Sequence, residues 1–277
     1  MPELPEVESL RRILARSAVG RTIERARIAE PRLRRKVAHD FAAGVEGRRI
    51  ERLGRRAKYL IIELSDGAAM IVHLGMSGSL THRGKDFDDA EFAARHDHVE
   101  FALDDSTRLV YNDPRRFGLI RLVARGELAA APELAGLGPE PLSAGFNAEY
   151  LARMARGRRA AIKNLIMDQR VVAGVGNIYA SEILFRAGVR PTRRAAKVTR
   201  KEIERIVAAT APILRAAIGS RGTTFRSYRD SEGQPGRFAQ RLMVYGREGE
   251  PCRVCKSKIR NVTVGQRASF FCPRCQR

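Results

Sequence analysis

The four cysteines of this 277-residue chain restrict its possible folds more than any other feature, because all of them lie near the C-terminal end. They form two C-x-x-C pairs, Cys252 with Cys255 and Cys272 with Cys275. This spacing is typical of a zinc site with four thiolate ligands, and no cysteine remains for a disulfide framework. Four protein ligands leave no open coordination position. We therefore expect one structural Zn²⁺ as the cofactor and exclude a catalytic zinc.

The segment between the two cysteine pairs predicts a β-hairpin. Ile259–Val264 and Ala268–Phe271 have strand character, and Gly265–Arg267 joins them. So short a segment cannot bury a core of its own, so zinc binding would supply its folding free energy. Arg267 would lie at or near the tip, within reach of a phosphate. The alternative is a purely structural zinc ribbon on which Arg267 is only solvated.

The first part of the chain predicts one helix followed by β-hairpins. From Pro2 to about Ser17, apolar residues recur at helical spacing. Strand patterns follow, separated by turn sequences, at residues 56–64, 69–74, 99–103, 109–111 and 117–123. This order of elements indicates a β-sandwich with a helix docked at its edge.

The pattern changes at a stretch rich in Gly and Pro, so we place a linker at residues 136–145. Helical patterns come next, at 147–154, 162–166, 178–187 and 199–218, and Pro212 should kink the last of them. Residues 219–240 are polar and typical of a long functional loop. The predicted fold class is therefore α+β, with segments 1–135, 136–145, 146–240 and 241–277.

The charge of the chain indicates a polyanionic partner. Lys and Arg number 52 against 31 Asp and Glu, which gives a net charge of +21, and this is typical of nucleic-acid-binding proteins. A membrane surface would be the rival, but the sequence has no apolar run of spanning length and no long basic amphipathic helix. The start lacks the apolar segment of a signal peptide, so we expect a soluble, cytoplasmic protein.

The glycines of Gly174-x-Gly176 do not form a dinucleotide-binding fingerprint, because the third glycine and a preceding strand are missing. A connection between two helices is the better interpretation, with Asn177 and the amides after it facing a phosphate. Such a contact would hold a nucleic-acid backbone without reading its sequence.

Two turns each present a large apolar residue. Gly75–Ser79 carries Met76, and Asp113–Gly118 carries Phe117 beside Arg115. Core packing is the commoner fate of Met and Phe. The functional alternative is a wedge that enters a base stack beside a guanidinium.

The histidines His73, His96 and His98 do not have convincing metal-ligand spacing. A phosphate contact or a hydrogen bond in the core suits them better.

The start of the sequence can supply a nucleophile. If Met1 is removed, Pro2 has a free α-amine, and far more of it is unprotonated at neutral pH than of a lysine. Its adduct with a sugar carbon would be a cationic iminium, which acts like the Schiff base of a lysine. Glu3 could move protons for that amine. Taken alone, a simpler interpretation is that these residues open a helix.

Taken together, these residues resemble bacterial formamidopyrimidine-DNA glycosylase, a family of bifunctional base-excision enzymes. The similarity covers almost the whole chain and lies in Met1–Glu8, Arg56–Leu60, His73–Leu80, His96–Val99, Asp113–Gly118, Gly174–Glu182 and the cysteine hairpin with Gln266–Arg267. Motifs at this density identify the chain as a member of that family.

The resemblance implies that Pro2 attacks C1′ of a flipped, oxidised purine nucleotide while Glu3 supplies and takes up protons. The iminium would then allow β- and δ-elimination, which cuts the strand on both sides of the lost base. Lys58 and Arg267 would be proton donors in those eliminations. The implied partner is double-stranded DNA that contains 8-oxoguanine, formamidopyrimidines or abasic sites, and the protein would act as a monomer.

The resemblance also implies how DNA is held. Residues 146–240 would form a helix–two-turn–helix domain whose loop, about 220–236, caps the damaged base. Arg158 stands where the family often has Lys, which keeps the charge but changes the contact geometry. DNA contacts are implied for His73, His96, Arg115, Arg158, Lys163 and Asn177, and the wedge for Met76, Arg115 and Phe117.

Two alternatives remain open at this point. The sister enzyme endonuclease VIII shares the chemistry but prefers oxidised pyrimidines; Leu4, the wedge set and the long loop favour the purine enzyme. A zinc-ribbon DNA-binding protein without catalysis would use the Pro-Glu start only as a helix cap. It would form no covalent adduct with DNA.

Overall fold

The computed structural model of the chain describes residues 2–84, 94–224 and 230–277, which form two compact units. The first unit consists of Met1–Ala135 and Ala217–Ala239, and the second of Gly136–Ala216 and Gln240–Arg277. Residues 217–239, which lie within the predicted segment 146–240, thus belong to the same compact unit as the N-terminal residues. The division into four segments stays a prediction, because compactness does not show which segments fold independently.

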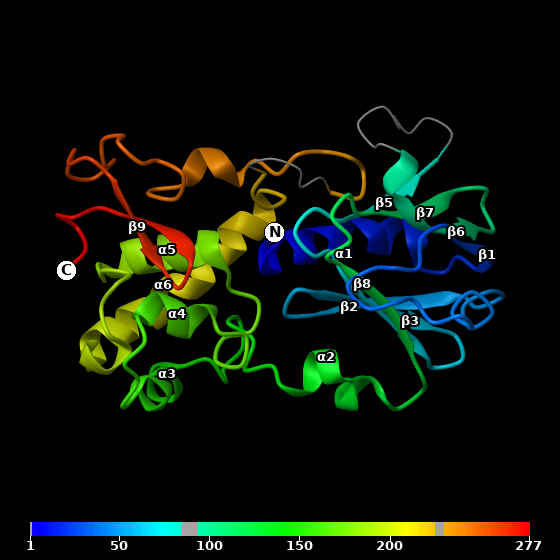
Figure 1. Ribbon diagram of the computed structural model, residues 1–277, viewed down its shortest axis with the longest axis horizontal. Coiled ribbons are helices and arrows are strands. Elements are labelled where there is room, and N and C mark those ends of the chain that lie inside the picture. Colours follow the sequence, from blue (N-terminus) through cyan, green and yellow to red (C-terminus); the bar gives the residue numbers. More distant parts are fainter. Residues whose placement is uncertain (1, 85–93, 225–229) are drawn as a thin grey trace. The chain divides into compact units, whose positions relative to one another are not determined.

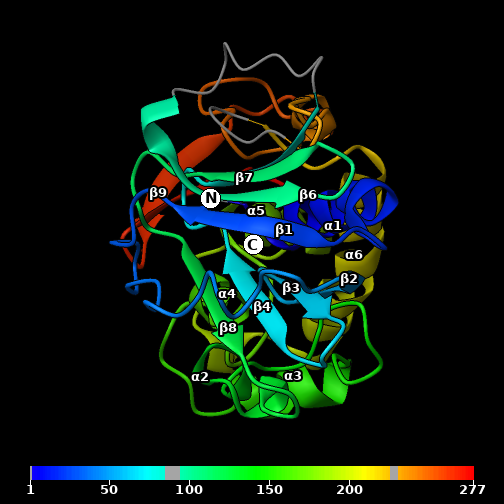
Figure 2. The ribbon, with the colours of Figure 1, turned by 90° about the vertical axis from the view of Figure 1, so that its right-hand side faces the viewer.

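The first unit is a sandwich of two four-stranded antiparallel sheets (Figures 1 and 2). One sheet has the strand order β1-β6-β7-β5 and the other β2-β3-β4-β8. Alternate side chains, such as Leu60 and Ile62 or Phe101 and Leu103, belong to the buried core. The strands are β1 Ile23–Ile28, β2 Ile50–Arg56, β3 Tyr59–Leu64, β4 Ala69–His73, β5 Ser79–Arg83, β6 Asp97–Leu103, β7 Arg108–Asn112 and β8 Leu119–Val123.

Helix α1 (Leu4–Ala18) packs against β2, β3 and β5. Because β2 and β5 are edge strands of different sheets, the helix closes one side of the sandwich. Its apolar stripe, with Val7, Leu10 and Leu14, joins the core between the sheets. The helix begins at Leu4 and not at Pro2, because Glu3 has extended dihedral angles and serves as the N-cap. The predicted docking of this helix at the sandwich edge is confirmed.

The strand predictions were incomplete. The predicted strand 56–64 is interrupted by the turn Ala57–Lys58, and the pattern missed β1, β5 and most of β2. In β5, Thr81 and Arg83 are buried, and Arg83 pairs with Asp97 of β6 through two hydrogen bonds of 2.8 and 3.0 Å. Buried polar residues give no hydrophobic alternation, so a hydrophobicity pattern cannot find such a strand.

The second unit consists of helices and the β9–β10 hairpin. Pro212 lies inside α6, which continues as helix on both sides of it. Helix α5 packs against α4 and β10. The elements are α3 Ala148–Ala155, α4 Ile162–Met167, α5 Asn177–Ala187, α6 Arg200–Gly219, β9 Arg260–Val264 and β10 Arg267–Phe271; α6 ends in the first unit, which also holds the short α2, Pro132–Ala135.

The predicted α+β class is confirmed: a β-sandwich with its docked helix is followed in the chain by helices and a four-cysteine hairpin. Within the described ranges, no helix is both long enough and apolar enough to cross a lipid bilayer.

Candidate active site

The N-terminal residues lie in a buried environment at the start of α1. Pro2 and Glu3 are both buried, and the backbone N–H of Glu3 donates to Oε2 of Glu6 at 2.8 Å. The other oxygen of Glu6, Oε1, accepts from the backbone N–H of Thr223 at 2.7 Å. Sequence reasoning missed Glu6, although a carboxylate three residues after the cap is the signal of a capping box.

Lys58 is presented by a strained turn between β2 and β3. Ala57 has φ of 52°, in the left-handed region, which costs a non-glycine residue about 1–2 kcal/mol. Lys58 itself is buried, with 6% of its surface exposed. Arg55 ties this turn to α1, because its guanidinium donates to the carbonyl of Ala57 at 2.9 Å and to Glu8 at 3.3 Å.

The carboxylate of Glu8, which accepts the hydrogen bond from Arg55, is ionised at neutral pH. Burial alone would raise the pKa of Glu8, but hydrogen bonds from Arg11 and Arg12, together with the charge of Arg55, lower it to about 2. The carboxylate therefore stays ionised and keeps its hold on Arg55 throughout the neutral pH range.

His73 is a buried, neutral imidazole at the end of β4. Burial first, and then the charges of Lys58 and Arg34, lower the pKa of His73 to about 4. The backbone N–H of Gly75 donates to its Nδ1 at 3.0 Å, so the ring proton is on Nε2. His73 therefore uses one nitrogen for a hydrogen bond in the core and has a donor on the other.

The two predicted wedge side chains do not pack in the core. Met76 is 38% exposed and Phe117 is 46% exposed, which places both among the few exposed large apolar residues in the described chain. The guanidinium of Arg115 lies 4.6 Å from the centre of the Phe117 ring, a cation–π distance. The core-packing alternative for Met76 and Phe117 is therefore wrong.

The other two histidines differ in exposure. His98 is buried, and its Nε2 lies 2.8 Å from the carbonyl of Asp113, a hydrogen bond in the core. His96 is only partly buried, and Nε of Arg95 donates to its Nε2 at 3.2 Å.

In the second unit, two of the predicted residues bind the same point of the hairpin. Nζ of Lys163 donates to the carbonyl of Ala268 at 3.0 Å and to Oγ of Ser269 at 2.7 Å. The amide of Asn177 donates to the same Ala268 carbonyl at 3.0 Å. Ala268 follows Arg267, so both side chains hold the strand that carries this arginine.

The exposure of these residues divides them into two groups. Lys163 is completely buried, whereas a residue that binds a phosphate directly would be expected at the surface. Arg267 is exposed, as is Arg158, which lies in the loop after α3. Asn177 is intermediate, and its Oδ1 is buried without a partner in the described part of the chain.

The hairpin turn is shorter than predicted. Gly265 and Gln266, with φ of 55° and 60°, form a two-residue turn, and Arg267 is the first residue of β10, opposite Val264. A side chain at position 265 would collide with the amide of Asn164. Glycine at this position lets the turn pack directly against α4.

The four cysteines form a structural zinc site. Their sulfur atoms all lie within 4.8 Å of one another. Two of the separations, Cys252 to Cys275 at 3.9 Å and Cys255 to Cys272 at 3.4 Å, are close to the ~3.8 Å of four thiolates around Zn²⁺. The backbone N–H groups of Val254 and Cys275 donate to two of the sulfurs, which would support them as thiolates.

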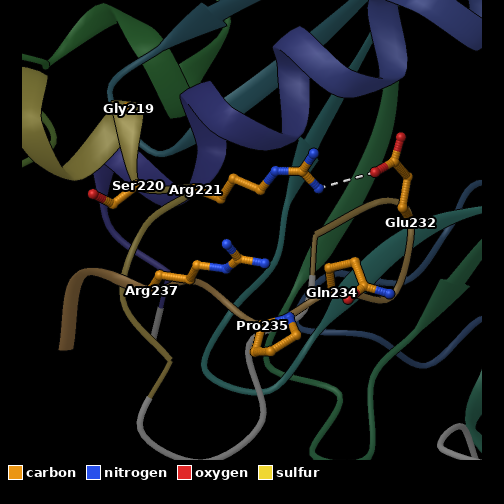
Figure 3. Close-up of a pocket in the computed structure, with 7 residues that line it drawn as sticks. All are labelled: Gly219, Ser220, Arg221, Glu232, Gln234, Pro235 and Arg237. Carbon is orange, nitrogen blue, oxygen red and sulfur yellow. Dashed lines mark hydrogen bonds and ion pairs between the residues drawn. The ribbon is translucent and has the colours of Figure 1, made fainter. Parts of the chain in front are cut away.

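The segment 217–239 is anchored on both sides of residues 225–229, which lie outside the described residues together with that part of the predicted cap. Before them, Thr223 is bound to Glu6. After them, the carbonyl of Ser231 accepts from the N–H of His82 on the edge strand β5 at 2.9 Å. Arg221 joins the two sides, because it pairs with both Asp230 and Glu232 at 3.0 Å. Figure 3 shows the pair with Glu232.

A polar pocket of about 440 Å³ lies at the base of this segment (Figure 3). The side chains of Arg221 and Arg237 both extend along it. The described residues that line it are Gly219, Ser220, Arg221, Glu232, Gln234, Pro235 and Arg237, and none of the predicted catalytic residues is among them.

Comparisons with known proteins cover the whole chain. Its residues 1–120 match the model of the formamidopyrimidine-DNA glycosylase N-terminal domain, 137–229 that of the H2TH domain of the same enzymes, and 249–277 a zinc finger found in FPG and IleRS. Formamidopyrimidine-DNA glycosylases of Halorhodospira halophila and Methylococcus capsulatus are 46% and 47% identical to it over 277 residues, which is 100% of each chain.

Solved structures agree with this assignment. The MutM (Fpg) protein of Thermus thermophilus matches with a TM-score of 0.87 and 39% identity, over 99% of this chain and 98% of that one. A Lactococcus lactis FPG mutant bound to Fapy-dG containing DNA matches with a TM-score of 0.91 and 32% identity over 100% of both chains. Since relatives of this similarity align from end to end, the chain is a DNA glycosylase and belongs to the formamidopyrimidine-DNA glycosylase family.

Proposed function

We propose that this enzyme removes oxidised purines from duplex DNA through a covalent adduct at Pro2 and then cuts the strand at the abasic site. The observation that carries the proposal is the start of α1, where the Pro2–Glu3 pair is buried and capped by Glu6. Arg55 joins the same helix to the turn that bears Lys58. The nitrogen of Pro2, the carboxylate of Glu3 and the ammonium of Lys58 thus come from connected parts of one compact unit.

The substrate class is supported by the similar solved structures. Structures of Lactococcus lactis Fpg contain Fapy-dG or abasic-site DNA, and one of MutM contains carbocyclic 8-oxo-G DNA. The net charge of +21 suits duplex DNA as the partner. We place this reaction on the DNA of the cytoplasm.

Pro2 acts only after Met1 has been removed, because the nitrogen of Pro2 is otherwise part of an amide. The free secondary amine attacks C1′, and the base leaves with the electron pair of the glycosidic bond and takes up a proton. Loss of the amine proton and opening of the sugar at O4′, which is protonated in turn, gives the iminium. Glu3 is the group nearest in sequence to move these protons.

The iminium then withdraws electrons from C2′, so that a C2′ proton is lost and the 3′ phosphate is expelled. A second elimination expels the 5′ phosphate. Lys58 and Arg267 are the proposed proton donors of these steps. The turn that bears Lys58 is buried and is joined to α1 through Arg55, which holds this donor in a fixed place.

DNA is held, in this proposal, by exposed cations and by hydrogen-bond donors. Arg115, Arg158 and Arg267 are exposed guanidiniums that each neutralise a phosphate, while His73, His96 and Asn177 contribute hydrogen bonds. We propose that Met76 and Phe117 fill the space left by the flipped nucleotide. Lys163, which is buried, contributes by holding the hairpin strand next to Arg267.

The test is to trap the covalent intermediate. Borohydride added during turnover of a duplex with one 8-oxoguanine should reduce the iminium and link the protein to DNA, and peptide mapping should find the link at Pro2. Glu3→Gln should lose base excision but still nick a pre-formed abasic site, where no glycosidic bond remains. A chain with a blocked N-terminus should bind DNA but show neither activity.

The same experiment separates the alternatives. A link at Lys58 or another lysine would overturn the role of Pro2. Efficient trapping only on oxidised pyrimidines would indicate the specificity of endonuclease VIII, and no link with any lesion would indicate a DNA-binding protein without catalysis.

A further inference from the structure

Asp113 is a completely buried carboxylate whose oxygens bind groups from two different turns. Oδ1 accepts from the hydroxyl of Ser77 at 2.7 Å and from the backbone N–H of Arg115 at 3.3 Å. Oδ2 accepts from the backbone N–H of Gly118 at 2.9 Å and from the hydroxyl of Tyr111 at 3.4 Å. Ser77 follows Met76, and Arg115 and Gly118 flank Phe117, so one side chain binds both turns that carry the exposed apolar residues.

The backbone of Asp113 is bound as completely as its side chain. Its N–H donates to the carbonyl of His96 at 3.0 Å. Its carbonyl accepts from the N–H of Arg116 at 3.1 Å and lies 2.8 Å from Nε2 of His98. A buried carboxylate is tolerated where donors surround it, and its removal would leave those donors unsatisfied.

Direct backbone packing joins the two turns in addition to the carboxylate. A Cβ on Gly75 would collide with the backbone of Phe117 and Gly118. A Cβ on Gly118 would collide with the hydroxyl of Tyr111 and the carbonyl of His73. No side chain lies between the two turns at these points, so their backbones are in direct contact.

We propose that Asp113 is a positioning residue that fixes the Met76 turn and the Phe117 turn as one rigid wedge. The inference rests on the proposed function, in which both side chains enter the base stack. Two apolar side chains on independent mobile turns would lose conformational entropy on insertion, whereas a pre-organised pair loses little. Asp113 supplies this pre-organisation from its buried position between the two turns, without contact with DNA.

The test is single-turnover excision of 8-oxoguanine from a fully paired duplex and from one in which the lesion is already unstacked. Asp113→Ala should slow excision from the paired duplex at least about tenfold, because the wedge then offsets less of the cost of unstacking the lesion. It should have little effect on the unstacked substrate, where that cost is already absent. Adding Phe117→Ala to Asp113→Ala should slow the paired reaction by less than about twofold more, because an unfixed Phe117 no longer acts as a wedge. A merely structural defect would slow both substrates alike.

A milder variant keeps the test valid if Asp113→Ala does not fold. Ser77→Ala removes only the bond to the Met76 turn, so it should abolish the effect of Met76→Ala while leaving that of Phe117→Ala. Ser79→Ala is the matched control, because its hydroxyl makes no bond to Asp113, and it should change neither.

The outcomes distinguish the role of Asp113 from the proposed role of Met76 and Phe117 as a wedge. If Met76→Ala and Phe117→Ala have no effect in the parent protein, the wedge itself is wrong and the role of Asp113 falls with it. If both matter but their effects multiply with those of Asp113→Ala and Ser77→Ala, only the coupling by Asp113 is overturned. Trapping at Pro2 is unaffected by either result.

Discussion

The two compact units each present an exposed arginine at or next to a short turn, but they support these arginines in different ways. Arg115 sits on a turn that a buried carboxylate holds within the sandwich, with Asp113 at its centre. Arg267 begins a strand of a small hairpin whose support is a cluster of four cysteines. Hydrogen bonds suffice where a large core already excludes water, whereas a small hairpin needs metal ligation to have any fixed structure.

The largest expected effect is the loss of the metal-dependent support. Cys272→Ser should lose zinc and with it about 10 kcal/mol of binding free energy, so the hairpin should unfold and DNA affinity should fall sharply. The sandwich has its own core and should stay folded. Metal analysis, amide exchange and a DNA-binding titration would measure this. A zinc-free variant that binds DNA as tightly as the parent would remove the hairpin from the interface.

The support beneath the Met76 turn should depend on pH through His73. The folded pKa is about 4 and the ordinary value is 6.5, so the unfolded state binds more protons between these pH values and stability falls as pH falls through that window. This difference between the folded and the ordinary pKa corresponds to about 3 kcal/mol. His73→Asn keeps an acceptor near the position of Nδ1 but cannot titrate.

The measurement is urea unfolding at pH 7 and at pH 4 for both proteins. The parent should lose about 3 kcal/mol more than His73→Asn between these values. Equal losses would mean that this imidazole does not oppose protonation in the folded state.

Lys163 offers a way to weaken the hairpin's support without touching its metal ligands. Lys163→Met keeps much of the buried volume but leaves Ala268 and Ser269 without their charged donor, a cost of about 1–3 kcal/mol. We expect retained zinc, faster amide exchange in β10 and weaker DNA binding. Lys197→Met, which removes an exposed lysine, is the control. Unchanged exchange in β10 would show that Lys163 does not position the hairpin.

The smallest effect is expected at the turn that carries Lys58. Ala57→Gly should relieve the left-handed strain and, after the entropy of glycine in the unfolded chain is subtracted, stabilise the protein by up to about 1 kcal/mol. Ser106→Gly, at another residue with positive φ, should give a similar gain. Only Ala57→Gly should slow strand cutting at an abasic site, because only that turn holds Lys58. Equal cutting rates for the two variants would show that the strained backbone at Ala57 has no role in catalysis.

The sequence predicted the fold where hydrophobic spacing was clear and missed it where buried residues were polar. The stripe on α1 and the alternation in β3 and β6 are carried by apolar side chains. Strand β5 has Thr81 and Arg83 in buried positions, and the guanidinium of Arg83 is paired there with the carboxylate of Asp97 on β6. That partner is fixed by the pairing of β5, β7 and β6, which no local pattern reveals.

The candidate site was predictable by residue type but not by environment. The motifs singled out Lys163 as a DNA contact, yet its neighbours Ile162, Leu165 and Ile166 are buried and so is its own side chain. Glu6 and Asp113 stood inside the quoted motifs without a role. Each carboxylate accepts several hydrogen bonds, and one donor to each, Thr223 for Glu6 and Ser77 for Asp113, lies far away in the chain.

The discontinuity of the first unit has a consequence for synthesis on the ribosome. The sandwich can form once residue 135 has left the exit tunnel. Two of its hydrogen bonds form only later, when the N–H of Thr223 becomes available to Glu6 and the carbonyl of Ser231 to the edge of β5. The whole stretch 136–216 is made in between. A nascent chain therefore contains Pro2 and Lys58 well before the segment that completes their unit. The unit that is synthesised first is completed only after most of the second unit has been made.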